Sequence, residues 1–161
     1  MKNMWLLFVI ALALTAGTQT VSAGDTPMSP VMISLLTPVQ APPPEWDVNG
    51  LRVDLLYGRC NNLRGLDLGL VNHTTGNEVG LAAGLVNYTE KRFTGLQVGA
   101  VNLAEDAYAL QVGLFNGADD MCGIQIGLIN NTRIMRGCQI GLINVIENND
   151  LSFLPIFNCF F

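Results

Sequence analysis

A short motif recurs through most of the chain at a nearly constant interval. The motif is clearest as GIQIGLIN at 123–130 and GCQIGLIN at 137–144, and its eight copies begin at residues 50, 65, 80, 95, 109, 123, 137 and 151. The interval between successive starts is constant over the first four copies and then shortens by a single position for the rest of the chain. A nearly fixed period of this length is typical of repeat architectures, in which each unit stacks on its neighbours.

Within each unit, aliphatic residues alternate with glycine and with small or amide residues. In GIQIGLIN the second, fourth and sixth positions are aliphatic, whereas the first, third and fifth are Gly, Gln and Gly. A period of two predicts a β-strand. The spacers between units are polar and contain Gly, Asn and Asp, which favour turns. Only three charged residues fall inside the units: Arg52, Asp54 and Asp67. The sequence thus predicts an all-β fold of eight repeated short strands.

Two all-β folds place one strand in each repeat of this length. In an antiparallel meander each spacer is a hairpin turn, and in a β-solenoid each unit with its spacer is one full coil. A straight eight-residue strand spans about 23 Å, and a six-residue spacer reaches at most about 25 Å. A solenoid therefore requires the unit to bend, for which its fifth-position Gly is suited. We predict an antiparallel meander that curls into a small barrel, and the β-solenoid with bent coils is the alternative.

Other features of the repeat fit the solenoid. The spacers are nearly uniform in length, and units two to eight end in Asn72, Asn87, Asn102, Asn116, Asn130, Asn144 and Asn158. In a solenoid these side chains could stack as an amide ladder, whereas in a meander each would open a turn. Pro155 in the last unit suits an edge in either fold.

Closure into a barrel would remove the two edges of an eight-stranded meander, and eight is the smallest common strand number of outer-membrane barrels. The last strand, with Phe153, Phe157 and Phe161 on one face, resembles the C-terminal strand of bacterial outer-membrane barrels. The resemblance implies aliphatic positions that face lipid, Gly and Gln positions that face the lumen, and two partners: outer-membrane lipid and the envelope assembly machinery.

The repeated unit, G-[LIV]-Q-[LIV]-G-[LIV]-[VI]-N, also resembles the repeats of an uncharacterised family of bacterial surface-repeat proteins, known from spirochaetes and other Gram-negative groups. The resemblance covers residues 50–158, and the first and last units depart from the pattern. It implies an envelope location and no catalytic residues.

The N-terminal residues have the features of an export signal. Lys2 precedes an apolar run at 4–17, and VSA at 21–23 has the small-x-small form that signal peptidase cleaves. We expect residues 1–23 to be a removed signal peptide. Residues 24–49, which hold six of the seven prolines, form a Pro-rich leader, and residues 50–161 form the eight-unit β-repeat domain. The predicted location is the outer membrane or the cell surface.

Few residues indicate catalysis or ligand binding. The one histidine, His73, lies in a predicted turn, and Asp119, Asp120 and Cys122 are interpreted as an acidic turn rather than as metal ligands. The chain has no phosphate loop, zinc spacing or haem motif. With 8 basic and 13 acidic side chains it does not have the composition of a nucleic-acid-binding protein. We expect no enzyme activity, catalytic residue, cofactor, metal site or nucleic-acid partner.

These observations favour a non-enzymatic cell-envelope repeat protein, an outer-membrane β-barrel with a structural or pore-like role. The alternative is a secreted or surface-displayed β-repeat binding module.

The four cysteines of an exported chain can form disulfides, with a connectivity that the sequence does not give. Cys122 and Cys138 distinguish the two folds. The meander places them far apart and predicts no bond between them, whereas stacked coils place them one layer and two positions apart.

Overall fold

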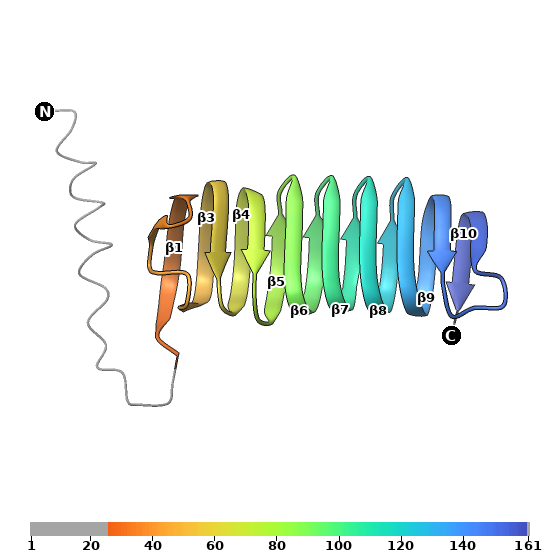
Figure 1. The fold of residues 1–161 in the computed structure, drawn as a ribbon, viewed down its shortest axis with the longest axis horizontal. Helices are drawn as coiled ribbons and strands as arrows, with labels where there is room; N and C mark the ends of the chain where they lie inside the picture. The colour runs from red at the N-terminus through yellow and green to blue at the C-terminus, as the bar shows by residue number, and fades with distance from the viewer. Residues whose placement is uncertain (1–25, 161) are drawn as a thin grey trace, which may run out of the picture.

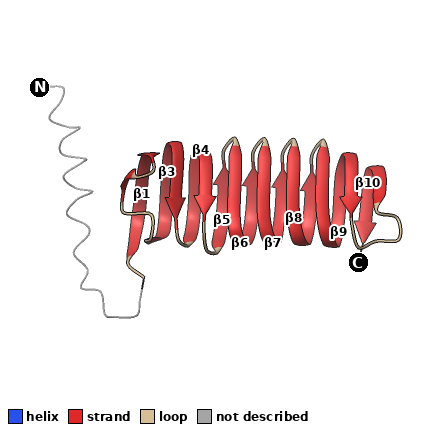
Figure 2. Ribbon diagram, in the orientation of Figure 1, coloured by secondary structure: helices blue, strands red, loops and turns tan. Residues whose placement is uncertain are grey.

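The computed structural model describes residues 26–160, and its regular elements are ten β-strands (Figures 1 and 2). The predicted signal peptide at 1–23 and the C-terminal Phe161 lie outside the described residues. The strands are β1 (Met28–Leu36), β2 (Val39–Ala41), β3 (Asp47–Cys60), β4 (Leu63–Thr74), β5 (Glu78–Ala83), β6 (Val86–Val98), β7 (Val101–Val112), β8 (Phe115–Ile126), β9 (Ile129–Ile146) and β10 (Phe153–Phe160).

From β3 to β10 the strands pair in chain order, and the pairs from β3 to β9 are parallel. Each residue lies beside the equivalent residue of the next repeat, so that Gly65 pairs with Gly80 and Gln111 with Gln125. Figure 1 shows the resulting single stack of coils, from β1 in orange to β10 in blue. The prediction of an all-β repeat fold is confirmed, and its form is the β-solenoid given as the alternative.

The antiparallel meander and its closure into a barrel are wrong. They rested on straight units joined by hairpin turns, whereas the chain bends inside the unit at its fifth and sixth positions, as at Gly99–Ala100 and Gly113–Leu114. The spacers are themselves strand, since β7 runs without a break through the spacer at 103–108. With the unit bent and the spacer extended, a single repeat is long enough to close one coil.

Glycine at most first and fifth positions permits the close stacking of the coils, although the fifth unit has Ala109 at its first position. Gly65, Gly80 and Gly95 have φ values of 137°, 139° and 136°, which favour glycine over any residue with a side chain. At the fifth position, a Cβ added to Gly99 would lie 2.6 Å from the carbonyl oxygen of Gly84 in the preceding coil. The glycines of the repeat therefore allow the backbones of neighbouring coils to come close together.

The two ends of the stack depart from parallel pairing. At the N-terminal end, β1 from the Pro-rich leader lies parallel to β3, and β2 folds back antiparallel on β1. At the C-terminal end, β10 runs antiparallel to β9 and is joined to it by the Cys138–Cys159 disulfide. Both edges of the stack are thus partly covered by strands of the same chain, which limits edge-to-edge pairing with other molecules.

The solenoid has a largely polar interior and an aliphatic exterior. The third and eighth positions of the unit point inward, and Gln97, Gln111, Gln125 and Gln139 are fully buried there, as are Asn102 and Asn116 among others. Apolar interior residues form two smaller clusters, one around Phe93, Met121 and Met135 and one at the N-terminal end with Met32, Val48, Cys60 and Leu63. The aliphatic second, fourth and sixth positions point outward, as the barrel hypothesis had placed them, but the amide positions face a packed interior.

Two ladders of amide side chains run through the interior. The Asn ladder extends from Asn72 to Asn144, each Nδ2 donating to the Oδ1 of the next coil at 2.7–2.8 Å. The predicted member Asn158 lies outside it, because β10 is antiparallel and places Asn158 beside Gln139. The Gln ladder runs from Gln97 to Gln139 with its donors pointing toward the preceding coil. Each stacked amide donates a hydrogen bond to one neighbour and accepts one from the other, so the amides can be buried without leaving polar atoms unpaired.

Candidate functional site

The candidate functional site is an uncovered aliphatic surface that follows the stack along its length. Its centre is the sixth position of the first seven units, at the corner made by the bend that follows the fifth position. We name this column the aliphatic ridge: Leu55, Leu70, Leu85, Ala100, Leu114, Leu128 and Leu142. Its leucines are between 42% and 65% exposed. A corner is convex, so these side chains project from the body of the protein.

Aliphatic side chains also cover the strand segments on either side of the ridge. On one side lie the second and fourth positions of the unit, for example Leu66, Leu68, Ile124 and Ile126. On the other side lies the seventh position, with Val71, Val86, Val101, Phe115, Ile129 and Ile143. We call the ridge and these flanks the aliphatic surface. Large continuous apolar surfaces of this kind mark sites of interaction with proteins or membranes.

The exposed charges gather at a different corner of the coils. This charged corner consists of Glu90, Glu105, Asp119 and Arg133, which occupy equivalent positions in consecutive coils, together with the next column, Arg92, Asp106 and Asp120. Several of these charges are paired: Arg92 Nη2 lies 3.2 Å from Asp106 Oδ2, and Arg133 Nη2 lies 3.0 Å from Asp120 Oδ1. Charge and aliphatic surface are therefore separated around the coil.

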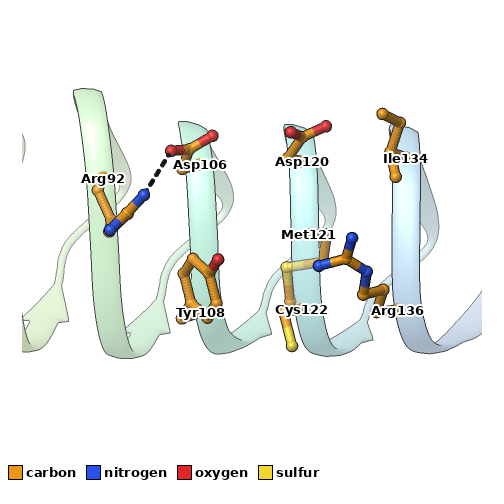
Figure 3. A pocket seen from close by; sticks show the side chains of 8 residues that line it. All are labelled: Arg92, Asp106, Tyr108, Asp120, Met121, Cys122, Ile134 and Arg136. Atoms are coloured by element: carbon orange, nitrogen blue, oxygen red, sulfur yellow. Dashed lines mark hydrogen bonds and ion pairs between the residues drawn. The ribbon is translucent and has the colours of Figure 1, made fainter. Parts of the chain in front are cut away.

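A groove lies next to the charged corner (Figure 3). It crosses the surface that we call the polar face, which carries the column Thr94, Tyr108, Cys122 and Arg136 and the adjoining Ile134. The lining of the groove includes Arg92, Tyr108, Cys122 and Arg136. The Arg92 guanidinium carbon lies 5.1 Å from the centre of the Tyr108 ring, a cation–π contact between neighbouring coils. Asp119, Asp120 and Cys122, interpreted from the sequence as an acidic turn, lie within β8 instead. Among the described residues no three His, Cys, Asp or Glu side chains are placed to hold a metal ion.

His73 lies in β4 and not in the predicted turn. Its Nδ1 is 2.6 Å from the Tyr57 hydroxyl, its Nε2 is 2.8 Å from Glu90 Oε1, and its ring stacks on Tyr88 with the ring centres 5.0 Å apart. These residues come from adjacent coils, so the imidazole connects the coils at the surface of the stack.

Cys122 and Cys138 are not bonded to each other, since Cys138 is paired with Cys159 and Cys122 is free. Cys122 pairs in the sheet with Arg136, and Cys138 pairs with Ile124, so the two cysteines are offset by one coil and two positions. This offset is the one expected for stacked coils. The absence of the bond agrees with the prediction from the meander, but it is consistent with the solenoid as well.

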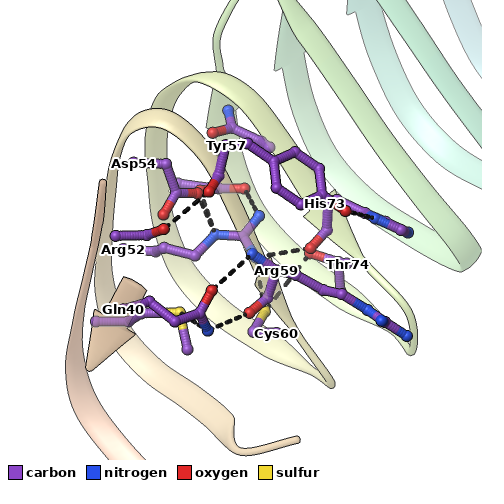
Figure 4. A network of polar contacts seen from close by, with 12 residues as sticks. Gln40, Arg52, Asp54, Tyr57, Arg59, Cys60, His73 and Thr74 are labelled. Carbon is purple, nitrogen blue, oxygen red and sulfur yellow. Dashed lines mark hydrogen bonds and ion pairs between the residues drawn. The ribbon is translucent and has the colours of Figure 1, made fainter. Parts of the chain in front are cut away.

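A cluster of charged side chains lies inside the first coils. The cluster was not predicted from the sequence. Arg52, Asp54, Asp67 and Glu78 are all at most 2% exposed. Figure 4 shows Arg52 and Asp54 in this interior, and Asp67 and Glu78 interact electrostatically with Arg52 there. A signal for it was present, because Arg52 and Asp67 occupy the inward third position that Gln fills later in the chain. Arg52 donates from Nε to Asp67 Oδ1 at 2.7 Å and from Nη2 to Asp67 Oδ2.

The comparisons with protein-family models, curated proteins and solved structures find no match to this chain. Across residues 26–160 no helix is long and apolar enough to span a membrane.

Proposed function

We propose that the protein is an exported, non-enzymatic module of the cell envelope that binds the acyl region of a lipid layer through its aliphatic surface. The observation that carries the proposal is the unbroken column of outward aliphatic side chains from Leu55 to Leu142, six of them leucines, with aliphatic flanks on both sides. The proposed role is that of a binding module attached to the envelope from one side.

The shape of the surface favours lipid over a protein partner. Because the ridge is a convex corner, a second flat sheet can cover one flank and leaves the other flank in water. Fluid acyl chains can surround a ridge and contact both flanks at once. The charged corner, which lies further along each coil, then remains in water together with the polar face.

The backbone of the solenoid is compatible with lipid contact. Polar backbone groups that face an acyl layer must be hydrogen-bonded within the protein. Along the stack they are paired between coils, and even at the bend the amide of Leu128 donates to the carbonyl of Leu114 at 3.0 Å. The stack can therefore lie with its side against a lipid layer, since its open edges are at the two ends.

The expected strength is that of reversible attachment. A leucine that is half exposed has roughly 1 kcal/mol still to gain from burial, at about 25 cal/mol per Å² of apolar surface. The six ridge leucines together would contribute on the order of 5 kcal/mol, comparable with a single acyl anchor. The flanks add to this, so stable binding requires the ridge and the flanks together.

The test is flotation of the mature chain, residues 24–161, with phosphatidylcholine vesicles, which carry no net charge. We expect the unsubstituted protein to float with the vesicles and the ridge variant L85E/L114E/L128E to lose at least about tenfold in binding. The matched control places the same three charges on the polar face, as T94E/Y108E/I134E, and should bind as well as the unsubstituted protein. Circular dichroism confirms that both variants keep the β fold.

Three results would overturn the proposal. The first is that the unsubstituted protein stays at the bottom of the gradient and does not float with vesicles. The second is an equal loss of binding in the control, which would show that the ridge is not the binding element. The third is a dimer that only the ridge variant dissociates, which would assign the surface to a second copy of the chain. Export is tested separately by N-terminal sequencing of envelope material, which should begin at Gly24 and not at Met1.

A further inference from the structure

The interior of the first three coils contains more buried acids than buried bases. Arg52 and Asp54 lie on β3 (Figure 4), Asp67 on β4 and Glu78 on β5. Each of these side chains is at most 2% exposed within the stack. One guanidinium thus faces three carboxyl groups. If all were ionised, two uncompensated negative charges would remain in a region without solvent, at a cost of several kcal/mol per ion.

The hydrogen bonds show which carboxyl group balances Arg52. Asp67 receives two donors of the guanidinium, from Nε and Nη2. The Nη1 nitrogen of Arg52 is directed to the His73 carbonyl oxygen at 2.9 Å and to Cys60 Sγ at 2.8 Å. Arg52 and Asp67 therefore form a neutral ion pair, and all three nitrogens of the guanidinium donate hydrogen bonds.

The carboxyl groups of Asp54 and Glu78 have oxygens without a hydrogen-bond partner. Asp54 Oδ2 lies 3.0 Å from Arg52 Nε, but the hydrogen on that nitrogen is directed to Asp67, and neither Asp54 oxygen has a hydrogen-bond partner. Glu78 Oε2 accepts from the Thr89 hydroxyl at 2.8 Å, while its Oε1 has no partner. No donor compensates the negative charge on these buried oxygens. A bound proton would neutralise each carboxylate and remove that charge.

We propose that Asp54 and Glu78 are a proton-binding site inside the first three coils, and that loss of these protons opens the N-terminal end of the solenoid. This inference goes beyond the proposed lipid binding and does not depend on it. The groups that face the site are the Arg52–Asp67 pair, the Cys60 thiol and the hydroxyls of Thr74 and Thr89.

The electrostatic environment agrees with this assignment. Burial, with repulsion from Asp67 as a further contribution, raises the pKa of Asp54 and of Glu78 to about 7, although Arg52 acts in the opposite direction. Burial also raises the pKa of the Cys60 thiol to about 12, so the thiol stays neutral. For Arg52, burial would lower the pKa, but the pKa is raised overall, chiefly by attraction and hydrogen bonding to Asp67, so the guanidinium stays charged.

A proton fits the site better than a metal ion. Among the described residues no three side chains of the metal-binding types converge, in this cluster or elsewhere. The Asp54 carboxyl is also packed against Gly58, where even an added Cβ would collide with it. A proton needs no additional ligands and no additional volume.

The direction of the pH effect follows from the raised pKa values. In the unfolded chain both carboxyl groups ionise near pH 4, whereas in the folded protein they ionise near pH 7. The stability that they contribute is therefore complete below about pH 4 and is lost as the pH rises through about 7. The coils from β7 to β9 carry Gln in the same column and have no such dependence.

The test is hydrogen exchange of the mature protein, measured by mass spectrometry at about pH 5.5 and about pH 8.5 and corrected for the intrinsic exchange rate. We expect residues 47–83 to lose at least about tenfold in protection at the higher pH, while residues 101–140 keep theirs. The variant D54N/E78Q should remove this difference, and the exposed control E105Q/D119N should retain it.

Two further measurements keep the proposal falsifiable if D54N/E78Q does not fold. Infrared spectra of the unsubstituted protein should show protonated carboxyl groups at about pH 6 that disappear by about pH 9. The proposal would be overturned if the protection of residues 47–83 were the same at the two pH values. It would also be overturned if the spectra showed no protonated carboxyl group at about pH 6. Restoration of protection at high pH by added Na⁺ or Ca²⁺ would also overturn it, because the bound cation would then be a metal ion.

Discussion

The first coils and the later coils of the solenoid have the same backbone register but different buried chemistry. At the inward third position, β3 and β4 carry Arg52 and Asp67, whereas β6 to β9 carry Gln. An amide both donates and accepts, so a column of identical amides can be extended by one coil at a time. An ion pair is complete after two coils, and a further charge in the same region needs a proton or another counter-charge.

The ends of the amide ladders show the limit of this mechanism. The buried amide atoms without hydrogen-bond partners include Asn72 Oδ1 and Gln97 Nε2, where the ladders begin, and Gln139 Oε1, where the Gln ladder ends. Gln97 has no partner on its N-terminal side because the adjacent residue of the column is Ala82. The Gln ladder is therefore satisfied in its middle and has an unpaired amide atom at each end, one of them at the boundary between the two regions.

The largest expected effect is on the ion pair of the first coils. Replacement of Arg52 with Met leaves Asp67 charged and buried without a partner, and should lower the free energy of unfolding by about 3–5 kcal/mol. The double variant R52Q/D67Q should be less destabilised than R52M, because two stacked amides can hydrogen-bond to each other and leave no buried charge. Chemical denaturation measures both. The control R133M removes an exposed pair and should cost less than about 1 kcal/mol. Equal losses in R52M and R133M would contradict the assignment of the buried pair.

An intermediate effect is expected in the Asn ladder. Asn102 accepts from Asn87 at 2.8 Å and donates to Asn116 at 2.8 Å and to the Val112 carbonyl at 3.0 Å. Replacement of Asn102 with Ala leaves buried polar atoms unpaired on both sides, and should lower the unfolding free energy by about 2–4 kcal/mol. N131A, at a half-buried outward position, is the control and should change it by less than about 0.5 kcal/mol. If the two variants lose the same stability, the ladder is not a source of stability.

The smallest effect tests the boundary itself. Replacement of Ala82 with Gln would place an amide between Asp67 and Gln97 and give the Gln97 Nε2 an acceptor. We expect a gain of about 0.5–1.5 kcal/mol, the net value of a hydrogen bond. The control A82L adds similar volume without a polar group and should destabilise the protein through overpacking. Thermal unfolding of both variants separates the two effects, and a loss of stability in A82Q would show that the column cannot accept a longer side chain here.

The repeat, the strand character of the unit and the place where the coil bends were all predictable from the amino-acid order. Period-two alternation identified the strands, and the fifth-position Gly was recognised as the bend that a solenoid requires. The stacking of Asn side chains was also foreseen as a property of that fold. These features are local, and they are readable because every unit repeats them.

The direction of pairing and the burial of each face follow only from the packing of the coils on one another. Alternation gives the same pattern in parallel and antiparallel strands, so it did not exclude the meander, and the strand-like spacers were interpreted as turns. The aliphatic residues point outward because each narrow coil is filled by glycines that admit the neighbouring backbone and by amides that satisfy one another between coils. The burial of Glu78 is also a result of packing. Glu78 lies in a spacer and points inward, and the stacking of the coils places it near Arg52 and Asp67 of the two earlier coils.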